Sequence, residues 1–327
     1  MNEYEFDPRT LDPGKRRNGI SAFMRIKNGA AFLERAIESH IGYFDEVVAV
    51  YNDCVDSTPD ILERLAGKYP GTLRVFEYRP SVYPPGSKGH SLTPSDSVHS
   101  LANYYNYALS KTACKIVTKL DDDHLAIQRN LKKAVDSIRK KGLRKTALCY
   151  SGINLVKSPD GRLGVFCNLP FAGNKDCFFF PVSEETFFSQ APRYEVLHTP
   201  GYKKRYAGIL FFHLKFLKSN YGLDNYNLAE NPDSRLVRMR DFIRDHSEPM
   251  SLGEFLSLDT HYYLYPDAPD FLQPVRPGKY RITRKIDRVV PMLALLSRVL
   301  PGDIFLARAC RLREDMKDIS IPADLLM

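Results

Sequence analysis

The chain has 327 residues, of which 43% are hydrophobic and 26% are charged. This composition excludes the disordered, fibrous and solenoid classes and is sufficient for a large buried core. The 47 Lys and Arg residues outnumber the 39 Asp and Glu residues, which points to an anionic partner: a nucleic acid, an anionic membrane surface or a phosphorylated small molecule. No window approaches the roughly 18 uncharged apolar residues that a membrane span needs.

Residues 1–18 are polar and interrupted by Pro and Gly, so we predict a polar leader that is not a signal peptide. Strands are then expected at 19–28, 45–54 and 72–80, with helices at 29–44, 55–70 and 98–112. The long segment 81–99 between the third strand and its helix is expected to be a lid or a surface loop. A fourth strand ends at the acidic run 121–123. This order predicts an α/β domain with a mostly parallel sheet covered by helices, in which ligands bind beyond the carboxyl ends of the strands.

The second half is predicted to contain a basic helix at 127–145, a hairpin across "KSPDGR", a strand at 175–183 and an aromatic, helix-like stretch around His213. Near residue 245 the sequence becomes loop-like. We therefore divide the chain into the leader 1–18, a catalytic domain 19–245 and a C-terminal extension 246–327. The six cysteines form no CxxC pair, and we expect them to be reduced thiols in the cytoplasm.

The run "LDDDHLA" contains the chemistry that best defines a site. In an extended chain, Asp121 and Asp123 face one point while Asp122 faces away. Two nearby carboxylates in a partly desolvated site favour a hard divalent cation, and Mg²⁺ or Mn²⁺ commonly joins such carboxylates to substrate phosphates. The alternative is that Asp123 caps the helix that follows and the other two carboxylates are solvated.

Together these motifs resemble the nucleotide-sugar-dependent glycosyltransferases of the GT-A fold, most closely the large family 2 group. In "MRIKNGAAFLERAIESHIGYFDEVVAVYNDCVDST", Asn52 and Asp53 fall at the acidic turn after the second strand of that family. In "NYYNYALSKTACKIVTKLDDD", Asn106 matches the Asn of the family's Arg-Asn-x-Gly helix. Tyr105 and Ala108 depart from that motif.

The resemblance implies a GT-A fold and a nucleotide site. Asp53 would contact the base, Asp121 the ribose or the metal, and Asp123 an Mn²⁺ or Mg²⁺ ion that bridges the diphosphate. The other residues implied at the nucleotide site are Met24, Arg25, Lys27, Asn52, Asn106 and Lys119.

An inverting transferase also needs a carboxylate that takes the proton of the acceptor hydroxyl. Asp176 is the first candidate, followed by Glu184 and Glu185. In metal-dependent members of the fold a downstream histidine often completes the metal site, and His213 is the first candidate, ahead of His198 and His124. A packed core histidine is the competing interpretation of His213.

The segment 284–313 combines apolar residues with Arg and Lys. It predicts either an interfacial contact with an anionic membrane or packing against the catalytic domain or a second subunit. We therefore expect a metal-dependent glycosyltransferase in the cytoplasm, acting alone or as one module of a larger enzyme at the inner face of the membrane. It would move a sugar from a UDP-sugar to a glycan or lipid-linked saccharide in surface polysaccharide synthesis.

Two alternatives remain. A nucleotidyltransferase would need a Gly-rich phosphate loop after the first strand. The stretch "RIKNGAAFLER" has only one glycine, which argues against this alternative. A nucleic-acid-binding module would use the basic helix, but aromatic residues are not interleaved there, so we expect no nucleic-acid partner.

Overall fold

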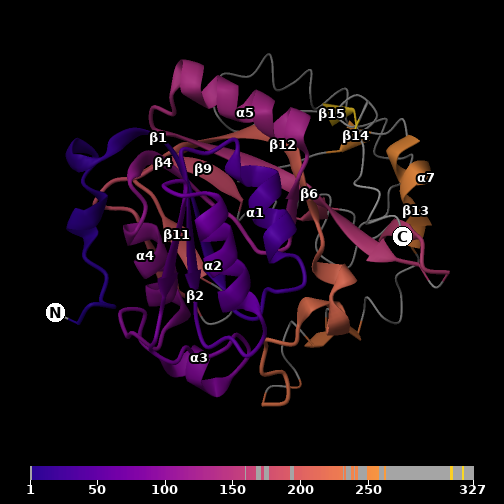
Figure 1. Cartoon of the computed structure of the whole chain (residues 1–327), viewed down its shortest axis with the longest axis horizontal. Helices are drawn as coiled ribbons and strands as arrows, with labels where there is room; N and C mark the ends of the chain where they lie inside the picture. The colour runs from indigo at the N-terminus through magenta and orange to yellow at the C-terminus, as the bar shows by residue number, and fades with distance from the viewer. Residues whose placement is uncertain are drawn as a thin grey trace.

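The computed structural model describes residues 2–158, 160–166, 171–172, 177–191, 195–230 and 249–257, together with 232, 237–238, 240–241, 261–262, 310–311 and 319. Within these residues an 11-stranded mixed sheet forms the centre of the molecule, with helices on both faces (Figure 1). The described part of the chain contains no helix that is long and apolar enough to cross a membrane.

Four parallel strands form the half of the sheet that comes from the N-terminal sequence. Their order is β3 (Leu73–Glu77), β2 (Glu46–Tyr51), β1 (Arg17–Ile26) and β4 (Cys114–Lys119). The side chains of β2 from Glu46 to Val50 are all buried, as expected for a parallel strand with helices on both faces. The predicted parallel α/β core is therefore confirmed.

The sheet continues beyond β4 with strands of mixed direction. β9 (Phe178–Pro181) runs antiparallel to β4 and to β6 (Thr146–Lys157). β6 forms the predicted hairpin with β7 (Leu163–Phe166) and also pairs with β8 (Phe171–Ala172). β12 (Lys203–His213) runs parallel to β6, and its end pairs antiparallel with β5 (His124–Ala126).

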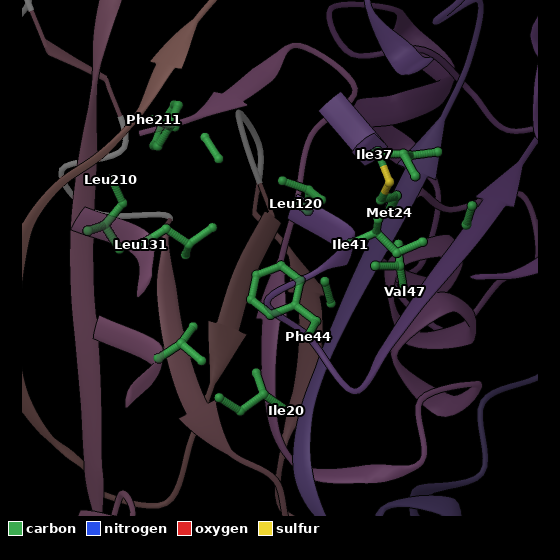
Figure 2. Packing of buried hydrophobic residues seen from close by; sticks show 14 of the residues in the cluster. Ile20, Met24, Ile37, Ile41, Phe44, Val47, Leu120, Leu131, Leu210 and Phe211 are labelled. Atoms are coloured by element: carbon green, nitrogen blue, oxygen red, sulfur yellow. The ribbon is translucent and has the colours of Figure 1, made fainter. Parts of the chain in front are cut away.

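The helices divide between the two faces of the sheet. One face packs against α1 (Leu33–Ile41), α2 (Thr58–Lys68) and α5 (Gln128–Lys141), whose apolar side chains join one buried cluster with those of β1. Figure 2 shows part of this cluster around Met24, Leu120 and Phe211. The opposite face packs against α4 (Leu101–Ser110), which is buried along nearly its whole length.

The N-terminal leader packs on the domain. It contains the short 3-10 helices η1 (Pro8–Leu11) and η2 (Pro13–Lys15), and Leu11 is fully buried. The Tyr4 ring lies 5.1 Å from the Tyr78 ring in an edge contact. Residues 2–16 thus extend the core beside α4.

The segment between β3 and α4 is ordered around α3 (Lys88–Leu92). His90 is buried, and its Nε2 lies 2.9 Å from Glu195 Oε1 in β11 (Glu195–His198), the partner of β10 (Phe187–Gln190). These contacts tie the segment to the domain.

The prediction of a helix-like stretch around His213 is wrong, because this stretch is strand β12 followed by η3 (Lys215–Leu217) and η4 (Ser219–Gly222). Its run Ile209–Phe212 is buried between two partner strands, and such short apolar runs suit a buried strand as well as a helix.

Part of the predicted C-terminal extension belongs to the sheet. β13 (Pro249–Ser251) pairs with β7, and α7 (Leu252–Ser257) buries Leu252 and Phe255 in the cluster that β6 and β12 share. β14 (His261–Tyr262) and β15 (Cys310–Arg311) form a separate antiparallel pair. The predicted segment 284–313 otherwise lies outside the described residues, so its membrane or packing role stays a prediction.

Candidate active site

The acidic run lies at the carboxyl end of β4, immediately before β5. The carboxylate of Asp121 contacts Lys119, whereas those of Asp122 and Asp123 both contact Lys218. The Asp121 carboxylate lies 3.1 Å from Lys119 Nζ. Burial acts to raise the pKa of Asp121, but Lys119 outweighs it and holds the pKa at about 2. Asp121 is therefore ionised at neutral pH.

Asp123 is the most enclosed of the three carboxylates, with 10% of its side chain exposed. Its Oδ1 lies 3.4 Å from His213 Nε2, and its Oδ2 lies 2.9 Å from Lys218 Nζ. Burial acts to raise its pKa, but His213 and Lys218 hold the pKa well below the ordinary value. Contrary to the prediction, Asp122 does not face away from Asp123: its Oδ2 lies 2.9 Å from the same Lys218 Nζ and close to where a side chain on Gly29 would stand.

Three neighbouring strands place two histidines and an asparagine beside Asp123. In the sheet register His213 stands opposite His124 of β5 on one side and opposite Asn154 of β6 on the other. The His213 and His124 rings meet edge to face at 5.3 Å. The sheet thus assembles Asn154, His213 and His124 in one row, although they are distant in the sequence.

Asn154 orients the His213 ring. Asn154 Oδ1 lies 2.8 Å from His213 Nδ1 and Asn154 is buried. A carbonyl oxygen only accepts, so this contact assigns a proton to Nδ1 and turns Nε2 towards Asp123. Metal-ligating histidines are commonly oriented in this way by a second hydrogen bond.

His124 is also suited to ligation, although the sequence analysis ranked it behind His213. It begins β5, is 2% exposed and stacks on Phe211 at 3.8 Å. Burial lowers the pKa of His124 to about 3, so the ring is neutral at pH 7. Its buried Nδ1 has no hydrogen-bond partner among the described residues, and Nε2 lies 3.5 Å from Asp121 Oδ2.

These groups fit a divalent cation. One ligand atom each from Asp123, His124 and His213 lies within 4.8 Å of the others. The 3.4 Å between Asp123 Oδ1 and His213 Nε2 is a separation expected for two ligands about 2.1 Å from one ion. A carboxylate with two imidazoles accepts Mn²⁺ as well as softer first-row ions. The sequence-based choice of Asp123 and His213 as ligands stays a prediction, now with a consistent geometry, and Asp121 lies beside the cluster.

Lys27 and Asp53 form an exposed ion pair where β1 and β2 end. Lys27 Nζ lies 2.8 Å from Asp53 Oδ2, and 61% of the Asp53 side chain is exposed. Asp53 has φ +45°, a backbone conformation that is sparsely populated and clusters at functional turns. Both side chains are at least partly exposed, and their contact with a nucleotide stays a prediction.

Arg25 and Met24 point to opposite faces of β1. Met24 is fully buried in the α1 cluster (Figure 2), so its side chain is a core residue. Arg25 lies on the α4 face with its guanidinium 4.6 Å from the Tyr105 ring centre, and its Nη2 donates to Tyr105 Oη. Its buried Nε has no partner among the described residues, so Arg25 keeps free hydrogen-bonding capacity near the site.

Asn52 and Asn106 have structural contacts instead of the expected exposure to a nucleotide. Asn52 is 1% exposed and donates to the carbonyls of Tyr78 and Pro80. Asn106 is 5% exposed and exchanges two hydrogen bonds with the backbone of Phe188, at 2.9 and 2.6 Å. The structure therefore corrects the predicted nucleotide contacts of these two side chains, because their amides are already used to satisfy buried backbone groups.

Glu184 and Glu185 do not reach the acidic run. They follow β9, which runs antiparallel to β4 and ends with Pro181 opposite Ile116 near the start of β4. Both exposed glutamates therefore lie near the amino end of β4, whereas the acidic run lies at its carboxyl end. The prediction of either as the base is therefore corrected. Asp176 lies outside the described residues and stays a prediction.

His198 is likewise remote: it pairs opposite Phe187 in the two-stranded sheet and contacts Ser189 Oγ at 2.6 Å. Sequence analysis did not select two residues that complete the site, Asn154 and Lys218. Neither lies in a motif, and only the register of β12 with β6 and the turn after β12 bring them to Asp123.

Residues 2–162, which include β1 to β6 and the acidic run, match the family model described as beta-1,4-N-acetylgalactosaminyltransferase (CgtA). Comparison with curated protein sequences gives no match.

Three solved structures show partial likeness. S. aureus TarS 1-349 in complex with UDP is 20% identical with a TM-score of 0.30, over 41% of this chain and 36% of that one. The mannosyltransferase PcManGT from Pyrobaculum calidifontis, in complex with GDP-Man and Mn²⁺, is 20% identical with a TM-score of 0.32, over 52% and 46%. Glucosyl-3-phosphoglycerate synthase from Mycobacterium tuberculosis, in complex with Mn²⁺, UDP and glucosyl-3-phosphoglycerate, is 18% identical with a TM-score of 0.24, over 36% and 38%.

This chain therefore spans less than half the length of each of these three proteins. The family match covers the parallel strands and the acidic run at their carboxyl ends. The chain is thus similar to a family of glycosyltransferases over residues 2–162, just under half of its length.

Proposed function

We propose that this chain is a glycosyltransferase that takes its sugar from a UDP-sugar and depends on Mn²⁺ or Mg²⁺ held by Asp123, His213 and His124. The observation that carries the proposal is the convergence of these three side chains, with Asn154 fixing the ring of His213. When bound, the ion stabilises the negative charge that develops on the diphosphate leaving group.

The residues around the cluster would divide the remaining tasks. Lys119 and Lys27 supply positive potential at the ends of β4 and β1 and favour an anionic donor there. Asp53 is exposed for contact with the base, and Asp121 for contact with the ribose. Arg25, beside Tyr105 on the α4 face of the sheet, adds an Nε donor without a partner among the described residues.

UDP-N-acetylgalactosamine is the first donor to test, because the matched family is described as N-acetylgalactosaminyltransferases. The acceptor would be a glycan or lipid-linked saccharide in surface polysaccharide synthesis at the inner face of the membrane. We further propose that segment 284–313 contacts an anionic membrane. The chain would act as a homo-oligomer or as one module of a larger enzyme. Asp176 remains the candidate for the base.

Donor hydrolysis without an acceptor tests this proposal. We expect Mn²⁺ and UDP together to raise the melting temperature, and Mn²⁺ to support slow hydrolysis of one UDP-sugar. Asp123→Asn should lower the hydrolysis rate about 100-fold or more, since a bound metal ion supplies several kcal/mol of charge stabilisation. Asp136→Asn is the matched control, because Asp136 is an exposed residue of α5 that pairs with Lys132. The proposal fails if Mn²⁺ and UDP leave the melting temperature unchanged, or if Asp123→Asn retains the wild-type rate.

A further inference from the structure

Lys218 lies between two carboxylates of the acidic run. Its Nζ is 2.9 Å from Asp122 Oδ2 and 2.9 Å from Asp123 Oδ2. Only 17% of the Lys218 side chain is exposed. The exposed fractions of the Asp122 and Asp123 side chains are 17% and 10%. A buried ammonium in this position neutralises the like charges that the sequence places side by side.

The chain segment that carries Lys218 is itself held against the site. Lys218 joins η3 to η4, and it is followed by Asn220 and Tyr221, both with positive φ of +46° and +54°. Further along, Asn225 Nδ2 donates to the Lys27 carbonyl, and Asn28 Nδ2 donates to Asn225 Oδ1. The segment 215–225 therefore crosses the ends of β1 and β4, which delivers the ammonium to Asp123.

Asp123 thus faces a fixed protein cation on Oδ2 and the His213 ring on Oδ1. A divalent ion at this carboxylate and the Lys218 ammonium compete for the same negative charge, because each lowers the electrostatic gain of the other. Asp122 is the second partner of Lys218 and can keep the ammonium when Asp123 binds an ion.

We propose that Lys218 and Asp122 form a charge pair that sets how tightly the site binds its divalent cation, with Lys218 as the competitor and Asp122 as its alternative partner. This inference rests on the proposed metal site and assigns positioning roles to two residues outside the ligand set. It predicts opposite effects of the two substitutions, which a merely structural role would not produce.

Removing the ammonium in Lys218→Met frees the Asp123 carboxylate from its competing cation. We therefore expect Mn²⁺ to bind about tenfold more tightly or better, as interactions between partly buried charges a few ångströms apart permit. Asp122→Asn removes the alternative partner and one negative charge. Lys218 then pairs with Asp123 alone, and Mn²⁺ binding weakens by about tenfold.

Calorimetric titration of the full-length chain with Mn²⁺ alone, without nucleotide, measures these affinities. Lys215→Met is the matched control: Lys215 belongs to η3 and faces the Tyr226 ring at 5.3 Å, so losing its charge should leave Mn²⁺ affinity close to wild type. Lys218→Arg keeps the charge and should stay near wild type as well. If Lys218→Met does not fold, the Asp122→Asn and Lys218→Arg affinities decide the question.

The outcomes separate this inference from the proposed function. If the wild-type chain binds Mn²⁺ and Lys218→Met binds it equally or less tightly, the competitor role is wrong and the metal site stands. Tighter binding by Asp122→Asn also overturns the inference. If the wild-type chain and Lys218→Met both fail to bind Mn²⁺, the metal site itself is wrong and the inference falls with it.

Discussion

Replacing Asn154 tests whether His213 is oriented for metal binding. Asn154 is 3% exposed and stands opposite His213 in the register of β6 and β12. Its Oδ1 lies 2.8 Å from His213 Nδ1, and the other ring nitrogen faces Asp123. Asn154→Leu keeps the branched shape of the side chain but removes the acceptor, so the ring is free to change its tautomer or its orientation.

The structure allows two magnitudes to be estimated for Asn154→Leu. Loss of a hydrogen bond that orients a metal-ligating histidine lowers metal affinity by about 10- to 100-fold. Leaving the buried Nδ1–H without an acceptor lowers the free energy of unfolding by about 1–3 kcal/mol. The substitution should therefore weaken Mn²⁺ binding strongly while the protein remains folded.

Calorimetric Mn²⁺ titration, together with urea unfolding of the metal-free protein, separates the two effects. Asn154→Asp is the matched control, because its carboxylate still accepts from Nδ1–H and makes the ring a more basic ligand. We expect Asn154→Asp to bind Mn²⁺ at least as tightly as wild type. A folded Asn154→Leu protein with wild-type Mn²⁺ affinity would refute the assignment of His213 as an oriented ligand.

The parallel half of the fold could be predicted from local patterns. Runs such as 45–54 are apolar on both faces, and the intervening helices have apolar residues on one face, which is the pattern of covered parallel strands. Because β1, β2 and β4 are parallel, their carboxyl ends lie at the same side of the sheet. This rule correctly predicted that Lys27, Asp53 and Asp121 lie at that side.

Strand direction was the information that the sequence lacked in the second half. β9 carries no signal that it runs antiparallel to β4, and this direction takes Glu184 and Glu185 to the far edge. His213 was predicted as a ligand candidate from the family resemblance, but its neighbours depend on the pairing of β12 with both β5 and β6. Such non-local pairings have no local sequence signature.

Side-chain direction was the second limit. Asn52 and Asn106 lie close to where sequence patterns put a nucleotide, yet their amides turn to buried backbone carbonyls and amides. Buried backbone groups require partners, and a sequence does not show which polar side chain will provide them. Lys218 illustrates the reverse: an ordinary lysine in a turn becomes a central charge because the turn lies over Asp123.

Three further predictions follow from these contacts. Asn106→Ala should lower the free energy of unfolding by about 1–3 kcal/mol in urea titrations while UDP affinity stays unchanged, and a selective loss of UDP affinity would restore the nucleotide role. The double substitution of Glu184 and Glu185 by Gln should change donor hydrolysis by less than about twofold, because both residues are exposed and remote; loss of transfer would contradict the strand register. Burial lowers the pKa of His40 from 6.5 to about 4, below its unfolded value. The neutral ring therefore contributes stability above pH 6.5 that is lost as the pH falls towards 4, by about 3 kcal/mol. Urea unfolding between pH 7 and pH 4 should show this loss in the wild type and a flatter profile in His40→Leu, and equal slopes in the two proteins would show that His40 is not buried in its neutral form.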